Sequence, residues 1–286
     1  ASCPSTSRSS NGKGFAVHIA VCIKQIPDPE IAPSLFRVDE ETKQVITVPG
    51  MSPVISPFDE QAIEAALKIR DAAEENAEVR ITALTIGDES ARGIVKHALA
   101  LGADDAVMMS DPAFADSDSF ATAFALSKAI ARLGAVDLVL AGRQAADLDA
   151  GVVGPGLAEL MGVPAITFAR KIEVVDGTVR VVRVLGDGSE TVEAPLPAVV
   201  TVAHEMGNVR NASLRETMRA AKKPVEAWAP ADINAEAGEI GANGARRNVE
   251  RLYVPAKDST CEFIDGDGPE AIAGALARRL VEEKIV

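Results

Sequence analysis

Residues 136–160 read VDLVLAGRQAADLDAGVVGPGLAEL. The apolar run 136–140 predicts a buried strand, and Pro155 predicts a helix that begins beside it, with a glycine-spaced loop between the two. The first N–H groups of a helix lack internal partners and lie at the positive end of its dipole, and Gly151 and Gly154 would let a ligand approach the backbone. The loop is therefore suited to bind a phosphate.

Spacing alone leaves two interpretations of this loop open. In one, the loop binds an anion, and Asp147 and Asp149 either cap the helix or accept hydrogen bonds from a ribose or a base. In the other, it is an ordinary strand-to-helix turn that needs glycine only for its geometry. The loop is neither a GxGxxG fingerprint nor a Walker A loop, because no Gly-Lys-Ser or Gly-Lys-Thr follows it.

Composition and charge limit the classes of ligand. The chain has 286 residues, of which 47% are hydrophobic, enough to bury a core in one large or two modest domains. Its formal net charge of -13 argues against nucleic acid as a principal ligand, because phosphate backbones select basic surfaces. The longest apolar runs, 135–141 and 198–203, are strand-sized, so the chain is not expected to span a membrane. One basic cluster is either a solvated helix face or a local docking patch: Arg215, Arg219, Lys222 and Lys223.

The reactive side chains form no recognisable catalytic or metal-binding constellation. The three cysteines are widely separated and have no CxxC spacing, which predicts neither a disulfide framework nor a zinc or iron–sulfur site and fits the reducing cytoplasm. The three histidines, His18, His97 and His204, are far apart in the sequence and are expected to be packed structural groups. If the protein takes part in catalysis, a cofactor is expected to carry the chemistry.

Strands and helices alternate after a serine-rich segment, 1–14, that is expected to be a flexible tail. Strands are predicted at 16–23, 79–86 and 106–109 and at the run ending at Ala141, and helices at 57–73, 90–101 and 117–133. This order predicts an α/β fold in which helices cover both faces of a parallel sheet. Such sheets bind ligands beyond the carboxyl ends of their strands, so four segments are expected to form one rim: 22–28, 55–60, 85–88 and the loop after 142.

The second half of the chain has a different pattern. Asp176-Gly177 predicts a tight turn between β-rich runs at 171–175 and 178–185, and further strands are predicted at 191–193 and 199–204. A polar loop at 205–210 precedes a helix that reaches Ala221, and the chain is irregular from 224 to 247 before a final helix at 269–284. An irregular segment this long is more typical of an arm lying on a partner than of a separate domain.

Five motifs carry a family resemblance: CIKQIPD at 22–28, SPFD at 56–59, ALALGAD at 98–104, GRQA at 142–145 with the two following aspartates, and ASL at 212–214 followed by basic residues. Together they resemble the β subunit of electron transfer flavoproteins, and the resemblance covers nearly everything from about 17 to 286. It implies an obligate heterodimer with an α subunit, with which this chain would share an FAD. It also implies an adenine nucleotide α-hydrolase-like (Rossmann-like) fold with a β-hairpin extension and a long C-terminal arm.

The function implied by the resemblance is electron transfer. Such a heterodimer carries electrons from flavin dehydrogenases of the acyl-CoA dehydrogenase type towards a quinone reductase or another acceptor. The β subunit of the family also binds a nucleotide, which is AMP in ordinary members and a second FAD, reduced by NADH, in electron-bifurcating members. The implied organisation is an α/β nucleotide-binding domain at 15–229, with a partner-recognition loop near 207–220, and an arm at 230–286 that packs on the α subunit.

Carried onto this chain, the family's nucleotide site occupies four places on the rim. It comprises Cys22, Ser56, Pro57, Phe58, Asp59, Ile86, Gly142, Arg143, Gln144, Ala145, Asp147, Asp149, Ala150, Gly151, Val152, Val153 and Gly154. Backbone N–H groups of 151–153 would contact phosphate, Arg143 would add a charged contact, and Phe58 would either touch a flavin ring or staple its helix. The expected partner-recognition residues are Arg210, Ala212, Ser213, Leu214 and Arg215, with Leu214 as the anchor.

The sequence favours FAD over AMP in this subunit but leaves both open. The CIKQIPD opening and the Val153-Gly154-Pro155 ending resemble bifurcating members. However, the loop at 147–155 reads DLDAGVVGP where those members usually read DGDTAQVGP, so a hydroxyl and an amide are missing, at about 0.5–1.5 kcal/mol per lost neutral hydrogen bond. Asn211 also replaces an aromatic residue common in the recognition loop, which leaves the docking partner open.

Two other functional classes stay in view. An adenine-nucleotide-binding stress or signalling module of the same fold, with no redox role, would explain the rim but would need neither the long arm nor the loop at Leu214. An ATP-dependent ligase or hydrolase would need a glycine-rich pyrophosphate loop near the first strand, where this chain has Lys24-Gln25-Ile26-Pro27. The bound ligand discriminates among the three classes.

Overall fold

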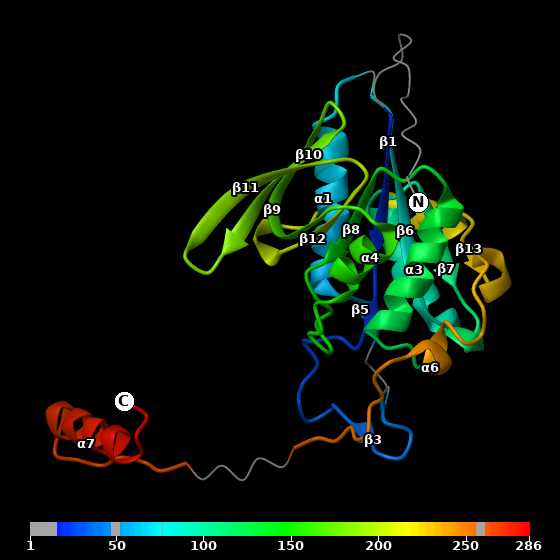
Figure 1. Ribbon diagram of the computed structural model, residues 1–286. Coiled ribbons are helices and arrows are strands. Elements are labelled where there is room, and N and C mark those ends of the chain that lie inside the picture. Colours follow the sequence, from blue (N-terminus) through cyan, green and yellow to red (C-terminus); the bar gives the residue numbers. More distant parts are fainter. Residues whose placement is uncertain (1–15, 47–51, 76, 256–260) are drawn as a thin grey trace.

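The computed structural model describes residues 16–46, 52–75, 77–255 and 261–286, and it centres on a nine-stranded sheet (Figure 1). The strand order from edge to edge is β11 (Gly188–Pro195), β10 (Thr178–Leu185), β9 (Ala165–Val175), β12 (Ala198–Val202), β8 (Leu138–Gly142), β1 (Val17–Cys22), β6 (Val79–Ile86), β7 (Asp105–Met109) and β13 (Glu226–Trp228). Neighbours from β9 to β13 are parallel, whereas β9, β10 and β11 pair antiparallel. The parallel α/β sheet predicted from the alternating pattern is confirmed.

Helices cover both faces of the parallel sheet. α1 (Pro57–Asp71) and α2 (Arg92–Leu101) pack on one face, and α3 (Ser119–Leu133) and α4 (Val153–Met161) pack on the other. Strand side chains alternate between the two cores, so that Val21 packs on the α1 side and Ala20 on the α3 side. Because both faces are covered, β1 from Ile19 onward and β8 are continuous apolar runs instead of alternating ones.

Local capping explains where helix starts differ from the predicted ones. The helix predicted from 117 begins at Ser119, because the Asp118 side chain accepts a hydrogen bond from a first-turn N–H group. The helix predicted from 90 opens with a 3-10 turn, η1 (Glu89–Ala91), before α2 begins. The helix predicted to begin beside Pro155 is α4, which starts two residues before it, at Val153.

An antiparallel extension continues the sheet beyond β9. β9 and β10 join through Asp176 and Gly177, whose φ angles are 48° and 74°, so the tight turn predicted at this dipeptide is confirmed. Between Ile166 and Ala169, β9 has one residue more than the paired stretch of β12. The extra residue forms a bulge that contains Phe168, whose φ of 60° is left-handed.

Several short elements were not predicted. β13 lengthens the sheet beside β7, and η4 (Pro230–Ile233) and α6 (Gly241–Gly244) lie on α3. Ile233 and Ile240 are buried there, so the chain packs on the α/β unit beyond residue 230. The remaining small elements are β2 (Gln25–Ile26) paired with β5 (Val54–Ile55), β3 (Val38–Asp39) paired with β4 (Gln44–Val45), η2 (Pro112–Phe114) and η3 (His204–Met206).

The C-terminal part ends in an isolated helix. α5 (Leu214–Lys222) packs against α2, and the chain then continues through β13 and α6 towards α7 (Pro269–Glu282). No residue of α7 is buried, and the helix lies well apart from the sheet (Figure 1). The predicted C-terminal arm and final helix are confirmed, whereas the predicted tail at 1–14 lies outside the described residues. In the part of the chain that the structure describes, no helix is long and apolar enough to cross a membrane.

Candidate functional site at the carboxyl edge of the sheet

The segments expected to converge meet at the carboxyl ends of β1, β6 and β8. β1 is hydrogen-bonded to both β6 and β8, which brings Cys22 beside Leu84 on one side and Ala141 on the other. The starts of α1 and α4 lie at the same edge, because α1 begins after β5 and α4 follows the loop that leaves β8. Strand order therefore gathers residues that are more than a hundred positions apart.

Asp59 joins the start of α1 to the two neighbouring strand ends. Its carboxylate accepts hydrogen bonds from the backbone N–H of Lys24, at 2.8 Å, and of Gly142, at 2.9 Å. Ser56 supplements these links, since its Oγ accepts from the N–H of Ala146 at 3.3 Å. The SPFD motif thus fixes the relative position of the loops that follow β1 and β8.

Burial shifts the ionisation of this carboxyl group. Asp59 is 7% exposed, and desolvation raises its pKa from the usual 3.8 to about 7, although the N–H groups of Gly142 and Lys24 act in the opposite direction. Burial, and to a smaller extent the charge of Asp59, raises the pKa of the Cys22 thiol to about 12. Cys22 is therefore a neutral packing group at neutral pH and not a nucleophile.

Glycine is required where the rim packs most closely. A Cβ atom on Gly142 would lie 2.5 Å from Oδ1 of Asp59 and 2.7 Å from Cβ of Phe58. A Cβ atom on Gly154 would collide with the Thr201 side chain on β12. The glycines therefore allow α1 and α4 to sit directly on the ends of the strands.

The loop between β8 and α4 is held by polar contacts, one with the segment after β1 and one within the loop. Nζ of Lys24 lies 2.6 Å from Oδ2 of Asp147, and Nε2 of Gln144 donates to Oδ1 of Asp149 at 2.7 Å. Asp149 and Gly151 have φ angles of 50° and 64°, so the loop makes two left-handed turns before the helix. Ala145 and Ala150 complete this loop.

The N-terminus of α4 has no side-chain cap. Val152 occupies the N-cap position and provides no side-chain hydrogen bond, whereas Asp118 caps α3 and Ser213 caps α5. The first N–H groups of α4, starting at Val153, have no partner within the helix by geometry. An anionic ligand would supply the hydrogen-bond acceptors that a capping side chain would otherwise provide.

Arg143 is positioned by aromatic rings. Its Cζ lies 5.0 Å from the centroid of Phe58 and 5.9 Å from that of Phe168, and its Nε is buried without a hydrogen-bond partner among the described residues. His204 also lies beside Phe58, with ring centroids 6.5 Å apart. Phe168 and His204 at this place were not predicted, because the sequence gives no sign of the bulge that turns Phe168 towards the rim.

Two predicted residues have peripheral positions in this arrangement. Pro57 is the exposed first residue of α1, where proline is favoured because it lacks an N–H group. Ile86 ends β6 and packs partly against the α3 side of the core. Both lie on the rim, and their contacts with a nucleotide stay predictions.

The segment predicted to recognise a partner is held firmly at its base and exposed at its tip. Arg210 forms ion pairs with Glu64, at 2.8 Å, and with Asp71, at 2.7 Å, and these contacts raise the pKa of its guanidinium. Ser213 and Glu216 form a capping box that starts α5. Leu214, the first residue of that helix, is 78% exposed.

Leu214 is surrounded by exposed apolar and basic side chains of α5. Met218, one turn further along α5, is 60% exposed, and Arg215 is exposed beside it. Ala212 instead packs partly against the core. The exposed face is thus apolar with a basic flank, while the residues before it are part of the fold.

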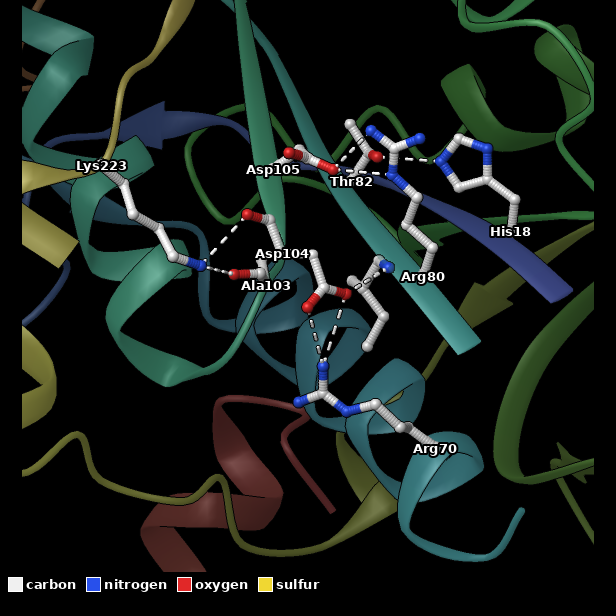
Figure 2. Close-up of polar contacts among 9 residues, drawn as sticks. His18, Arg70, Arg80, Thr82, Ala103, Asp104, Asp105 and Lys223 are labelled. Carbon is white, nitrogen blue, oxygen red and sulfur yellow. Dashed lines mark hydrogen bonds and ion pairs between the residues drawn. The ribbon is translucent and has the colours of Figure 1, made fainter. Parts of the chain in front are cut away.

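A cavity lies at the opposite, amino-terminal end of the strands. Its volume is about 460 Å³, and Arg70, Asp104, Arg219 and Lys223 contribute to its lining. Nζ of Lys223 donates to the carbonyl oxygens of Ala103 and Asp104, at 2.9 and 3.1 Å (Figure 2). These two cation contacts compensate the carbonyl groups that follow the C-terminus of α2, and they brace α5 against the sheet.

The same network accounts for His18. Its Nε2 lies 2.9 Å from Oγ1 of Thr82, next to the ion pair of Arg80 with Asp105 (Figure 2). Burial and the charge of Arg80 lower the pKa of His18. His18 is therefore a hydrogen-bonded structural histidine, as predicted. The same prediction is wrong for His97 and His204, whose side chains are 46% and 64% exposed. Among the described residues, no group of His, Cys, Asp and Glu could hold a metal ion.

Comparisons with known proteins agree with this arrangement. A family model described as the electron transfer flavoprotein domain matches residues 50–233. The electron transfer flavoprotein subunit beta of Megasphaera elsdenii is 33% identical over 278 residues, which cover 94% of this chain and all of the relative. The caffeyl-CoA reductase-Etf complex subunit CarD of Acetobacterium woodii is 34% identical, with 94% of this chain and all of the relative covered. Protein FixA of Azorhizobium caulinodans is 33% identical, with 92% and 95% covered.

Proposed function

The chain belongs to the electron transfer flavoprotein family as a β subunit, and from this premise we propose that it pairs with an α subunit in an obligate heterodimer. The heterodimer shares an FAD between its subunits and carries electrons from flavin dehydrogenases of the acyl-CoA dehydrogenase type to a quinone reductase or another acceptor. The α subunit would bind the arm and the apolar side chains of α7, which have no partner among the described residues of this chain.

A nucleotide in this subunit would bind at the rim. The observation that carries this proposal is the N-terminus of α4, which lacks a side-chain cap and follows a loop fixed by Asp59 and Ser56. Backbone N–H groups of 151–153 would hold phosphate, while Asp147 and Asp149 would limit the position of the ribose. The rest of the predicted site residues would contact the nucleotide from the ends of β1, β6 and β8.

FAD fits this rim better than AMP. Arg143 and Phe58 offer a cation and an aromatic face beside the phosphate loop, and a buried N–H of Arg143 has no partner in the described protein. Such groups suit a ligand larger than a mononucleotide. FAD, when bound, supplies the hydride-accepting and electron-donating chemistry. With a second FAD the heterodimer would oxidise NADH and be of the electron-bifurcating type. With AMP it would be an ordinary electron carrier.

The partner dehydrogenase would dock on the exposed tip of the recognition segment. Leu214 and Met218 present an apolar anchor, and the basic residues of α5 flank it. An adenine-nucleotide-binding signalling module without a redox role is not favoured, because it would need neither this tip nor α7. The cysteines described, Cys22 and Cys261, are free thiols, which suits the proposed cytoplasmic location.

The nucleotide content of the purified heterodimer tests the proposal. The chain is co-expressed with its α partner, the complex is denatured, and FAD and AMP are quantified by chromatography. Two FAD per heterodimer would support the bifurcating function, and one FAD with one AMP would assign an ordinary carrier. A complex without flavin would contradict electron transfer by this protein.

A further inference from the structure

Two aromatic side chains from distant elements enclose Arg143. Phe58 is the second residue of α1 and Phe168 lies in the β9 bulge, and their ring centroids are 5.0 and 5.9 Å from Cζ of Arg143. Both distances are within the range of a cation–π contact. We call these three residues the aromatic clamp. Since each ring comes from a different element, the clamp fixes where the guanidinium lies.

The backbone of Phe168 is unfavourable for the residue that occupies it. Its φ of 60° is rare for a bulky residue and would suit glycine better. The N–H of Phe168 donates to Oγ1 of Thr201 at 3.2 Å, which helps to hold the bulge. Strained backbone of this kind persists where the surrounding structure enforces it and often marks a functional site. The fold therefore tolerates strain at a position where an aromatic ring reaches Arg143.

One nitrogen of Arg143 has no hydrogen-bond acceptor in the described part of the protein. Its Nε is buried and makes no hydrogen bond among the described residues. Buried N–H groups are nearly always paired, and an unpaired one is costly. A bound ligand would supply the hydrogen-bond acceptor that Nε of Arg143 lacks, if the Arg143 side chain shifts to meet it on binding.

The aromatic clamp and the N-terminus of α4 lie on different sides of the rim, so they would contact different parts of a dinucleotide. Phe58 belongs to α1, whereas the uncapped N-terminus suited to phosphate belongs to α4 on the other face of the sheet. The guanidinium thus lies towards the α1 side of the rim. A mononucleotide with its phosphate at α4 and its nucleoside on that side of the rim would leave the α1 side free, whereas the second half of a dinucleotide would extend beyond the phosphates to reach it.

We propose that the aromatic clamp positions Arg143 to bind the flavin half of an FAD in this subunit, and that Phe168 is the positioning residue that selects FAD over AMP. The proposal rests on the nucleotide site proposed above. Guanidinium N–H groups donate hydrogen bonds, and the carbonyl and nitrogen acceptors of the flavin ring match them. AMP has no flavin ring and ends at its phosphate, so it would present no group to a clamp that lies beyond the phosphates.

Variants of Phe168 test this proposal in the complete heterodimer. Phe168→Gly removes the ring and relieves the backbone, Phe168→Tyr keeps an aromatic face, and Phe120→Leu is a matched control that removes the ring beneath Arg246 on α3. The β-site nucleotide is removed, FAD and AMP are titrated separately, and FAD per heterodimer is counted by absorbance. We expect Phe168→Gly to weaken FAD binding by about tenfold while AMP binding changes less than about twofold. Phe168→Tyr and Phe120→Leu should match the parent protein.

Thermal unfolding without nucleotide separates positioning from folding. Phe168→Gly should unfold no earlier than the parent, because glycine suits the left-handed backbone. Equal losses of FAD and AMP affinity, or unchanged FAD affinity, would overturn the proposal. So would a parent heterodimer that holds one FAD and one AMP and accepts no second FAD, although electron transfer would then stand. A heterodimer that binds no flavin at all would instead contradict the proposed function.

Discussion

At the rim, the carboxyl group of Asp59 is buried although it is ionisable, because it links two loops. Its two hydrogen-bond donors, the N–H groups of Lys24 and Gly142, lie 35 and 83 positions away in the sequence. The motif alone marks Asp59 as a site residue, but its linking role depends on strand order, which brings those donors together. The stability of the rim should therefore depend on pH through the ionisation of Asp59.

Asp59→Asn should change the pH dependence of stability. The pKa of Asp59 is about 7 in the folded chain and near 3.8 when exposed, so the folded state holds its proton more tightly. The parent chain therefore loses stability as the pH rises from 4 to 7, by up to about 4 kcal/mol at about 1.36 kcal/mol per pKa unit, and no further above that. The amide that replaces the carboxyl group does not titrate, so the stability of the variant relative to the parent should rise across this window.

Chemical denaturation between pH 4.5 and 8 measures this difference. Asp28→Asn is the matched control, since Asp28 ends the CIKQIPD motif of the same rim and is not buried. Parallel stability curves for the parent and Asp59→Asn would show that burial of the carboxyl group does not control the pH dependence.

Gly142→Ala should destabilise the fold. Its Cβ atom would lie 2.5 Å from Oδ1 of Asp59, so either α1 or the end of β8 must move, at a cost of about 1–3 kcal/mol. Gly93→Ala, on the exposed side of α2 with nothing within 4 Å, is the control and should be neutral or slightly stabilising. Urea denaturation compares the two. Equal stability of the two variants would mean that close packing at Gly142 is not required.

At the scale of elements, the recognition segment combines an anchored base with an exposed tip. Glu64 on α1 is 5% exposed, and it accepts from both the backbone N–H and the guanidinium of Arg210. A helix of the α/β unit thereby fixes the direction in which α5 presents Leu214. The sequence placed Arg210 among the partner contacts, but this structure shows that its guanidinium is engaged within the chain.

Glu64→Gln should loosen the recognition segment. The change removes a charged acceptor that two donors of Arg210 share, and we expect a loss of about 1–3 kcal/mol and faster amide exchange around 208–213. Glu60→Gln, one turn earlier on α1, breaks only an exposed pair with His97 and should cost less than about 0.5 kcal/mol. Hydrogen exchange by mass spectrometry resolves the segment. Unchanged exchange at 208–213 in Glu64→Gln would remove the argument that this ion pair holds the base.

Element prediction succeeded where the signal is local. Apolar runs gave β1, β6 and β8, and Asp176-Gly177 gave the hairpin turn, because periodicity and turn chemistry act over a few residues. It failed at β13, which has three residues and exists because the edge of β7 offers hydrogen bonds. It also failed at the β9 bulge, because the register of β9 against β12 is set by packing and no residue there signals a left-handed φ.

At the scale of the whole molecule, the chain separates into a packed α/β unit and a helix without a core of its own. The α/β unit accounts for the buried hydrophobic residues, whereas α7 carries Ile272, Leu276 and Val281 exposed. A helix of 14 residues with no burial is marginal in water, and tertiary packing normally supplies its stability. The sequence predicts the helix, but a single sequence does not define the surface of the α subunit on which we propose that it packs.

Substitutions on α7 should weaken pairing with the α subunit without unfolding this chain. Ile272 and Leu276 lie one turn apart on the same face, and Leu276→Asp would remove apolar area that is worth about 1.5–3 kcal/mol when fully buried. We expect at least about tenfold weaker heterodimer formation, measured by sedimentation, with an unchanged thermal transition of the α/β unit, because no residue of α7 is buried in it. Arg278→Gln, on another face of the helix, should leave pairing unchanged. A Leu276→Asp chain that pairs as tightly as the parent would mean that α7 does not dock on the α subunit through this face, and that the arm before it would have to provide the contact.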